Sequence, residues 1–331
     1  KKNSIRIEDY IVLQEEIINF ENVVGSLTPG EIEWIEFNKS VRISLLSRNS
    51  ELPARSGLNW GQRPEYNRDP NQAYLSIRSD ARREGFLPEK SFTFKGFSLV
   101  AEDTVEFDVI FGNGLSYPNV NWRETVNCPK TFFNNRMRFA LMIIDTLGRI
   151  LKDDKVYIME QVTPLFKYLK NKYPNLIGSE YIDANTISGT INSDGVMHQD
   201  AVRLSFKDQE FKAILSFDVF EHVPDYKKAF MESFRVLENG GRLIFTAPFI
   251  PDFDETEIRA RFDANGEINH ILEPEYHGDP MSSNGILCFQ HFGWDILSLF
   301  KDIGFKDAYA VVGWSFRLGF LTPQIIFIAE K

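Results

Sequence analysis

The sequence predicts an α/β fold, in which helices cover both faces of an open and mostly parallel sheet. Short apolar runs alternate with segments of helical periodicity through the second half of the chain. The clearest unit has an apolar run at Ala213–Phe220, a helical pattern at Asp225–Glu238 and a second apolar run at Leu243–Ala247. Asn239-Gly240-Gly241 supplies the residues that end such a helix. A strand, a helix and a strand within about forty residues predict one right-handed βαβ unit.

Composition limits the class of protein. The chain has 331 residues and a formal net charge of −10 at pH 7. Phosphate binding needs concentrated Lys and Arg, so we expect no nucleic-acid partner. No apolar run approaches the roughly twenty residues that span a bilayer, and the start shows no signal peptide, so we expect no membrane partner. Cys128 and Cys288 lie far apart in the sequence, which predicts no disulfide framework and a cytoplasmic location.

Residues 1–90 predict a helical and irregular segment. Ile5–Val24 and the stretch from Ile32 to Leu46 have the spacing of amphipathic helices. Ser47–Asp69 is rich in Asn, Pro, Gly and Arg and predicts a long loop, and Ala73–Gly85 predicts a short helix.

Residues 91–128 predict a small antiparallel β lobe, because aromatic and β-branched residues alternate with polar ones from Phe92 to Phe111. The polar segment Asn121–Arg138 leads into a helix that continues to Ile150. This segment either braces a domain junction or helps to cover a ligand, and both interpretations stay open.

The remaining elements follow the alternation of strand and helix that predicts a parallel sheet. The expected strands are Val156–Met159, Leu176–Gly178, Gly195–His198, Ala308–Val312 and Gln324–Ala329. The expected helices are Leu165–Lys172 and Trp294–Phe300, and Gly304 ends the second of them.

Carboxylates follow four successive predicted strands, at Glu160, Glu180, Asp200 and within Asp218–Glu221. Ligands of such sheets bind at the carboxyl ends of the strands. An acid after the second strand can accept hydrogen bonds from ribose hydroxyls, and one after the third can accept from the adenine amino group. The pattern therefore predicts an acidic rim suited to an adenosine group.

The order of these acids, followed by SFDVFEHVPD, RVLENGG and LIFTAPF, resembles the class I S-adenosylmethionine-dependent methyltransferases of the type 11 branch. The resemblance covers about residues 133–331. It implies a Rossmann-like, doubly wound, mostly parallel seven-stranded sheet with an antiparallel last strand, in a methyltransferase domain at residues 129–331. It also implies S-adenosylmethionine as the cofactor.

The same resemblance assigns roles to individual residues. Glu180 would hold the ribose hydroxyls, Asp200 the adenine amino group and the Ala201 amide a ring nitrogen, while Phe217-Asp218-Val219 would line the methionine portion. Most relatives have glycines in the loop after the first strand, but this chain reads EQVTP, so the Gln161 and Thr163 side chains would replace backbone contacts. The predicted cofactor-binding residues are Glu160, Gln161, Thr163, Glu180, Tyr181, Asp200, Ala201, Phe217, Asp218 and Val219.

A narrower subgroup, with EQVTPL in place of the glycine loop and later PEYHGDP and LCFQHFGWDIL segments, is also similar to this chain. That likeness implies an association with glycan synthesis. It also implies two Cys-x-x-Cys pairs, whose matching positions here are Ser98, Ala101, Cys128 and Thr131. Zinc needs about four ligands, so we expect residues 91–128 to form a zinc-ribbon-like lobe that has lost its metal.

Three residues are candidates for catalysis on the acceptor side. Glu221 and His222 follow the fourth strand, and His277 lies in the predicted acceptor-side insertion, residues 250–290. His277 is the preferred base, whereas the family resemblance also allows His222 to brace the sheet edge. Glu275 and His277 with a distant His could ligate a metal, but their spacing is not distinctive, and we expect no metal site.

The sequence therefore predicts an S-adenosylmethionine-dependent methyltransferase with a small-molecule or glycan-related acceptor. The alternative is a non-catalytic methyltransferase-like binding module, which the missing glycine loop favours. A nicotinamide-dependent oxidoreductase is disfavoured, because no Gly-x-Gly-x-x-Gly follows the first strand.

Overall fold

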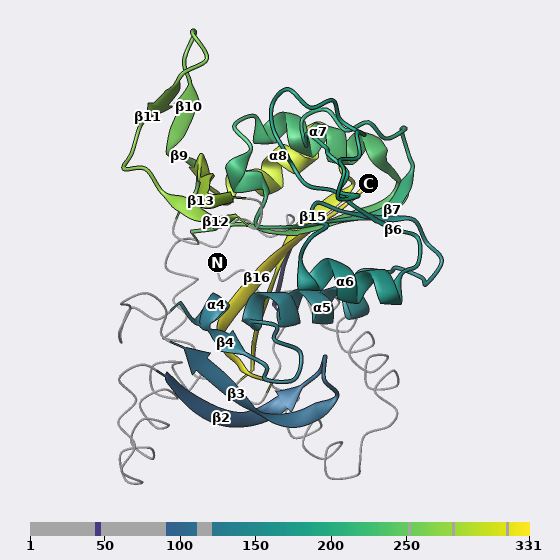
Figure 1. Ribbon diagram of the computed structural model, residues 1–331, viewed down its shortest axis with the longest axis vertical. Helices are drawn as coiled ribbons and strands as arrows, with labels where there is room; N and C mark the ends of the chain where they lie inside the picture. Colours follow the sequence, from purple (N-terminus) through teal and green to yellow (C-terminus); the bar gives the residue numbers. More distant parts are fainter. Residues whose placement is uncertain (1–43, 48–90, 111–120, 251–252, 280–281, 316–317) are drawn as a thin grey trace, which may run out of the picture. The chain divides into compact units, whose positions relative to one another are not determined.

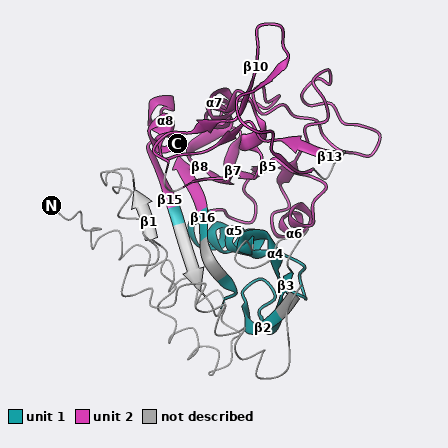
Figure 2. Ribbon diagram, turned by 90° about the vertical axis from the view of Figure 1, so that its left-hand side faces the viewer, with its two compact units in different colours: residues 1–45, 59–149, 311–325 teal, residues 46–58, 150–310, 326–331 magenta. Residues whose placement is uncertain are grey.

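A computed structural model describes most of the chain, namely residues 44–47, 91–110, 121–250, 253–279, 282–315 and 318–331. The predicted helices at Ile5–Val24 and Ala73–Gly85 and the loop at Ser47–Asp69 lie outside these residues. The chain divides into two compact units, coloured in Figure 2. Unit 1 comprises Lys1–Leu45, Asn59–Arg149 and Val311–Ile325, and unit 2 comprises Leu46–Leu58, Ile150–Ala310 and Ile326–Lys331.

The central sheet has the strand order β1-β15-β16-β8-β7-β5-β6. Strands β5 to β8 are parallel where they pair, and β16 runs antiparallel to β8, with Phe327 opposite Phe245. The expectation of a mostly parallel sheet with an antiparallel last strand is therefore confirmed. The strands are β1 (Ser44–Ser47), β5 (Val156–Ile158), β6 (Leu176–Gly178), β7 (Phe211–Phe217), β8 (Leu237–Thr246), β15 (Asp307–Ser315) and β16 (Phe320–Glu330).

Two predicted elements are wrong. Gly195–His198 forms isolated bridges, including one between Glu180 and His198, in place of a strand of the sheet. Its glycine has a left-handed backbone with φ of 78°, which interrupts an extended ladder. Leu45 and Leu46 lie in strand β1 and not in a helix, because this segment takes the edge position beside β15.

Helices cover both faces of the sheet in unit 2. Figure 1 shows α7 (Tyr226–Val236) and α8 (Asp295–Ile303) on one face and α6 (Pro164–Lys172) on the other. The Phe230 ring of α7 lies 4.6 Å from the Phe300 ring of α8 and 5.6 Å from the Phe245 ring of β8, measured between centroids. This aromatic layer is the core beneath the predicted βαβ unit. No helix in the described part of the chain is long and apolar enough to cross a membrane.

Unit 1 contains the predicted antiparallel lobe. Its described elements are β2 (Ser91–Ser98), β3 (Asp103–Ile110), α4 (Trp122–Thr125), β4 (Val126–Asn127) and α5 (Asn135–Leu147), and β3 pairs with both β2 and β4.

Arg138 of α5 is 2% exposed and braces unit 1 from inside. Its guanidinium donates to the backbone oxygens of Leu318, at 2.7 Å, and Gly319, at 3.1 Å, and to the Asn135 side chain. It also lies 4.2 Å from the centre of the Phe107 ring. These contacts hold Arg138 inside unit 1, and both interpretations of residues 121–138, the brace at a domain junction and the cover over a ligand, stay predictions.

The four positions that match zinc ligands in similar proteins lie around Cys128. Ser98 accepts a hydrogen bond from the Ala101 amide, and Ala101 packs against the core that contains Cys128. Burial raises the pKa of the Cys128 thiol, but hydrogen bonds with Ser98 and Thr131 outweigh it and hold the pKa below its usual value. The loss of zinc from this lobe stays a prediction.

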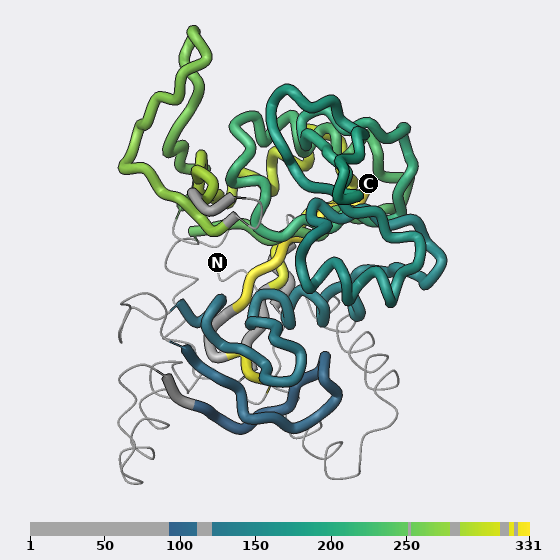
Figure 3. The backbone as a smooth tube through the Cα atoms, viewed as in Figure 1, coloured from purple at the N-terminus to yellow at the C-terminus, as the bar shows by residue number. Residues whose placement is uncertain are grey.

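The insertion predicted at residues 250–290 leaves the sheet after β8 and returns before α8. Figure 3 traces it as a projecting arm of β hairpins. Its strands are β9 (Glu257–Ile258), β10 (Ala260–Phe262), β11 (Ile268–His270), β12 (Tyr276–Asp279), β13 (Ser282–Leu287) and β14 (Gln290–His291), paired as β9 with β14, β10 with β11 and β12 with β13.

Candidate functional site

The loop after β5 is held by a carboxylate from the neighbouring strand. Glu180 Oε1 accepts hydrogen bonds from the backbone amides of Gln161, at 2.6 Å, and Val162, at 2.9 Å. Thr163 caps α6, where its hydroxyl accepts from the Phe166 amide at 3.1 Å, and Pro164 opens the helix. Charged acceptors of this kind are stronger than neutral ones, so the loop without glycines is tied to Glu180.

The Gln161 side chain faces the bridged segment that follows. Its amide nitrogen donates to the Gly195 oxygen, and its amide oxygen accepts from the Met197 nitrogen, both at 2.8 Å. Both ends of this side chain therefore hold residues 195–197. The contact of Gln161 with the cofactor stays a prediction. In the structure, the Gln161 side chain stabilises the bridged segment.

Asp200, the third of the predicted acids at strand ends, lies beside Glu180, the second. Glu180 accepts at its backbone oxygen from the Gln199 amide, which places Asp200 one residue further along the same turn. Asp200 Oδ1 accepts from the Val202 amide at 3.1 Å and thereby shapes the turn that contains Ala201. The exposed Tyr181 ring lies near Asp200, whose charge adds to burial in raising the pKa of the phenol.

The fourth predicted cofactor-binding segment, Phe217-Asp218-Val219, follows β7. Phe217 is 7% exposed, and Asp218 has a left-handed backbone with φ of 58°. The Asp218 carboxylate accepts a hydrogen bond from the Thr246 hydroxyl at 2.9 Å, and its amide donates to the Thr246 oxygen at 3.0 Å. These bonds join the carboxyl ends of β7 and β8 and hold Asp218 in its strained conformation.

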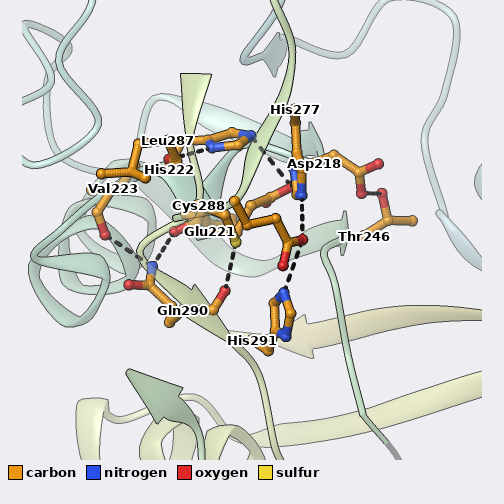
Figure 4. A network of polar contacts seen from close by, with 12 residues as sticks. Asp218, Glu221, His222, Val223, Thr246, His277, Leu287, Cys288, Gln290 and His291 are labelled. Atoms are coloured by element: carbon orange, nitrogen blue, oxygen red, sulfur yellow. Dashed lines mark hydrogen bonds and ion pairs between the residues drawn. The ribbon is translucent and has the colours of Figure 1, made fainter. Parts of the chain in front are cut away.

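The three predicted catalytic residues come together. Glu221 lies in the 3₁₀ turn Phe220–His222, and His277 reaches it from β12. Oε1 of Glu221 lies 3.6 Å from His222 Nε2 and 3.6 Å from His277 Nδ1. Figure 4 shows both imidazoles directed at this carboxylate, and their rings lie 5.0 Å apart at nearly a right angle.

Burial controls the charge of this cluster. The Glu221 side chain is fully buried, and neither of its carboxylate oxygens accepts a hydrogen bond from the residues that the structure describes. Burial raises its pKa to about 7 against the opposing effect of His277. The pKa of His277 is raised to about 9, first by Glu221 and also by Glu275, although burial lowers it.

Three residues missed by the catalytic prediction support the cluster. Glu275 Oε1 accepts from His277 Nε2 at 2.9 Å and from His291 Nε2 at 3.1 Å. Gln290 is buried, and its amide donates to the Phe220 and Val223 oxygens, which fixes the turn that carries Glu221. The signals in the sequence were the Glu-x-His spacing at residues 275–277 and two polar residues within the apolar segment 287–292.

Gly285 lies on β13 beside His277. Its φ is 72°, and a β-carbon at this position would lie 2.5 Å from the His277 backbone oxygen. The β12–β13 ladder changes register between His277 and Asp279. Only glycine allows the two strands to approach at the point where His277 turns toward Glu221.

These residues fit an adenosyl cofactor in the type of group that they offer. Glu180 and Asp200 provide carboxylates for hydroxyl and amino groups, and Phe217 provides apolar surface at the end of β7. The departure from the resemblance is the use of Glu180 Oε1 by the protein's own loop. In this chain the Glu180 carboxylate therefore holds the loop that glycines shape in most relatives. Glu180 and Asp200 still offer the acceptor oxygens that an adenosyl group requires.

Comparison with protein families gives two matches. The model of a methyltransferase domain matches residues 165–245, from α6 to the end of β8. The model of the NgoFVII C-terminal B3-like DNA-binding domain matches residues 34–126, of which the structure describes 44–47, 91–110 and 121–126. The second match runs against the expectation of no nucleic-acid partner, which stays a prediction. Comparison with curated proteins found no match.

Comparison with solved structures finds methyltransferases of low identity. A structure assigned as a sarcosine dimethylglycine methyltransferase from Galdieria sulphuraria has 17% identity and a TM-score of 0.28, over 34% of this chain and 46% of that chain. A possible histamine N-methyltransferase from Thermotoga maritima has 16% identity and a TM-score of 0.34, over 59% and 91%. A methyltransferase from Methanosarcina mazei has 18% identity and a TM-score of 0.33, over 55% and 94%.

The chain spans about half the length of the first of these relatives. TM-scores below 0.5 at such identities carry no argument about activity or substrate. The family match is the finding with weight, because it covers the strands and the helix on which the predicted motifs lie. Residues 165–245 therefore match a methyltransferase domain, and this match indicates S-adenosylmethionine as the cofactor.

Proposed function

We propose that this protein transfers a methyl group from S-adenosylmethionine to a small-molecule or glycan-related acceptor. The observation that carries the proposal is the methyltransferase-domain match over residues 165–245. The match covers strands whose carboxyl ends bear Glu180 and Asp218. A glycan-related acceptor is supported only by the resemblance of the EQVTPL loop.

The chain's own residues would bind and orient the two reactants. Glu180 would accept from the ribose hydroxyls and Asp200 from the adenine amino group, while Phe217 and Asp218 would face the methionine portion. Glu160, Tyr181 and the Ala201 amide complete the proposed pocket. Gln161 and Thr163 would act through the loop that they shape.

The cofactor supplies an activated methyl group on sulfur. The cluster of Glu221, His222 and His277 would take up the proton that the acceptor oxygen or nitrogen loses when it gains the methyl group. Most of the rate enhancement would come from alignment, because the sulfonium is already a good leaving group.

His277 is the member of this cluster that an acceptor would reach first. Its side chain is 28% exposed, against 8% for His222 and none for Glu221. His277→Ala is expected to lower kcat about 100-fold, because it removes a group that activates the acceptor. Methyl transfer to an acceptor found by screening small molecules and glycan precursors measures the change in kcat. His270→Ala is the matched control, since His270 lies in the same insertion with an exposed side chain.

Titration calorimetry with S-adenosylhomocysteine tests the proposed function before an acceptor is known. We expect micromolar binding with one site per chain. Lack of binding at millimolar ligand would exclude the methyltransferase and leave the non-catalytic binding module.

A further inference from the structure

We propose that Glu221, His222 and His277 bind a divalent transition-metal ion. Their ligand atoms, Oε1, Nε2 and Nδ1, all lie within 4.8 Å of one another. The two distances from the carboxylate oxygen to the imidazole nitrogens are both 3.6 Å. Bonds of about 2.1 Å in tetrahedral geometry place neighbouring ligand atoms about 3.4 Å apart. The three atoms are therefore spaced to accept one ion after small movements of the side chains.

Both imidazoles are fixed in the tautomer that metal binding requires. His222 Nδ1 lies 2.8 Å from the Leu287 backbone oxygen, which only accepts, so Nδ1 carries the hydrogen. His277 Nε2 lies 2.9 Å from Glu275 Oε1, so Nε2 donates there. In the neutral rings, the other nitrogen of each presents its lone pair to Glu221. Metal-bound histidines are held in this way by a carbonyl or a carboxylate behind the ring.

A metal ion would neutralise the buried Glu221 carboxylate more completely than the imidazoles beside it. Glu221 is fully buried, and neither of its oxygens accepts a hydrogen bond within the described chain. A buried carboxylate without hydrogen bonds is costly unless it is protonated, paired with a cation or bound to a metal. Two histidines and one carboxylate on one side of an ion are a common set for iron(II), and zinc, cobalt(II) and manganese(II) accept the same atoms.

A neighbouring group of possible ligands is less suitable. Glu275, Cys288 and His291 also lie within 4.8 Å of one another. However, Glu275 Oε1 already accepts from His277 and His291, and the Cys288 thiol donates to the Gln290 oxygen at 3.4 Å. The Glu275 carboxylate and the Cys288 thiol are therefore already engaged by other groups, and Glu275 supports the first cluster through His277.

Three protein ligands leave at least one coordination position open. His277 is the exposed member of the set, so the open position would face the side from which an acceptor arrives. This catalytic use rests on the proposed function, whereas binding of the ion does not. The inference departs from the sequence prediction of no metal site and makes His277 a ligand in place of a free base.

Metal titration of the full chain tests the proposal. The purified protein is treated with a chelator, dialysed and titrated with cobalt(II), and the visible absorption bands are followed. We expect one cobalt per chain with nitrogen and oxygen ligation and displacement by zinc. Glu221→Gln and His222→Ala should each weaken binding more than about 100-fold, and Glu275→Gln about 10- to 100-fold through the orientation of His277.

Matched controls separate this site from the rest of the chain. His270→Ala and Cys128→Ser should bind cobalt as the unaltered protein does, and His291→Ala should change affinity less than about tenfold. Circular dichroism checks that each variant folds. A rise in the melting temperature of the unaltered protein with cobalt gives a measurement that needs no variant.

The proposal is overturned if excess cobalt, zinc, iron(II) or manganese(II) fails to bind, or if Glu221→Gln binds cobalt normally. It is also overturned if Cys288→Ser or His291→Ala abolishes binding while Glu221→Gln does not. Calorimetry with S-adenosylhomocysteine on the same metal-free samples keeps the outcomes apart. Cofactor binding without metal binding removes only the metal site, and metal binding without cofactor binding removes only the proposed function.

Discussion

Glu180→Ala is expected to weaken S-adenosylhomocysteine binding about 1,000-fold. The Glu180 carboxylate holds the amides of Gln161 and Val162 and is the proposed acceptor for the ribose hydroxyls. A hydrogen bond to a charged group contributes about 1.5–3 kcal/mol. Loss of two ribose contacts and release of the loop would cost about 4 kcal/mol of binding, which is about 1,000-fold. Titration calorimetry measures the change.

Glu180→Gln separates charge from shape. It keeps the size of the side chain and one acceptor oxygen, so we expect an intermediate loss of affinity. Asp183→Asn is the surface control, because Asp183 is exposed and its carboxylate accepts hydrogen bonds from the Asn185 and Thr186 groups of its own turn. Unchanged affinity in Glu180→Ala would place the cofactor elsewhere.

Arg138→Ala is expected to lower the free energy of unfolding by about 3–5 kcal/mol. The substitution removes the guanidinium that donates to the Leu318 and Gly319 oxygens, and it opens a cavity against the Phe107 ring. Loss of a buried hydrogen bond from a charged donor costs about 1.5–3 kcal/mol, and the lost packing adds to it. Burial already lowers the pKa of Arg138 to about 9, which reflects how completely the charge is removed from water. Urea denaturation measures the effect.

Arg136→Ala is the control for Arg138, two residues earlier on the same helix. Arg136 pairs with Glu124 near the surface, at 2.8 Å. Partly exposed ion pairs contribute about 1 kcal/mol or less. Equal losses of unfolding free energy in Arg136→Ala and Arg138→Ala would contradict the structural role of Arg138. That role depends on the burial of the side chain, whereas both residues carry the same charge.

The sheet of unit 2 was predictable where each strand carries its own signal. Ala213–Phe217 and Leu243–Thr246 are apolar on both faces, as parallel strands between helices must be, and the intervening helix repeats its apolar residues every three to four positions. The acids at the strand ends follow from the same local pattern. Local periodicity is sufficient when burial is uniform along an element.

Residues 195–198 and 44–47 were assigned wrongly because pairing decides their structure. The segment before Asp200 has the apolar character of a strand, but Gly195 and the Gln161 side chain turn it into a bridged loop. Strand β1 gains its extended form from the sheet edge beside β15. Neither partner can be identified from residues adjacent in the sequence.

The cluster around Glu221 was predicted residue by residue and not as a unit. Glu221 and His277 are 56 positions apart, and the pairing of β12 with β13 brings them together. The Phe289 amide donates to the Glu221 backbone oxygen at 2.7 Å and fastens the insertion to the turn. The sequence shows which side chains are reactive, whereas their grouping depends on the hairpin register.

Gly285 has no functional group, yet the position of the reactive His277 side chain depends on it. Any side chain at this position meets the His277 backbone oxygen and pushes the histidine away from Glu221. In a library of all single substitutions selected for activity, position 285 should tolerate as little variation as position 277. The positions that do not tolerate substitution would therefore include the glycine that allows the backbone to approach, as well as the residues with reactive side chains.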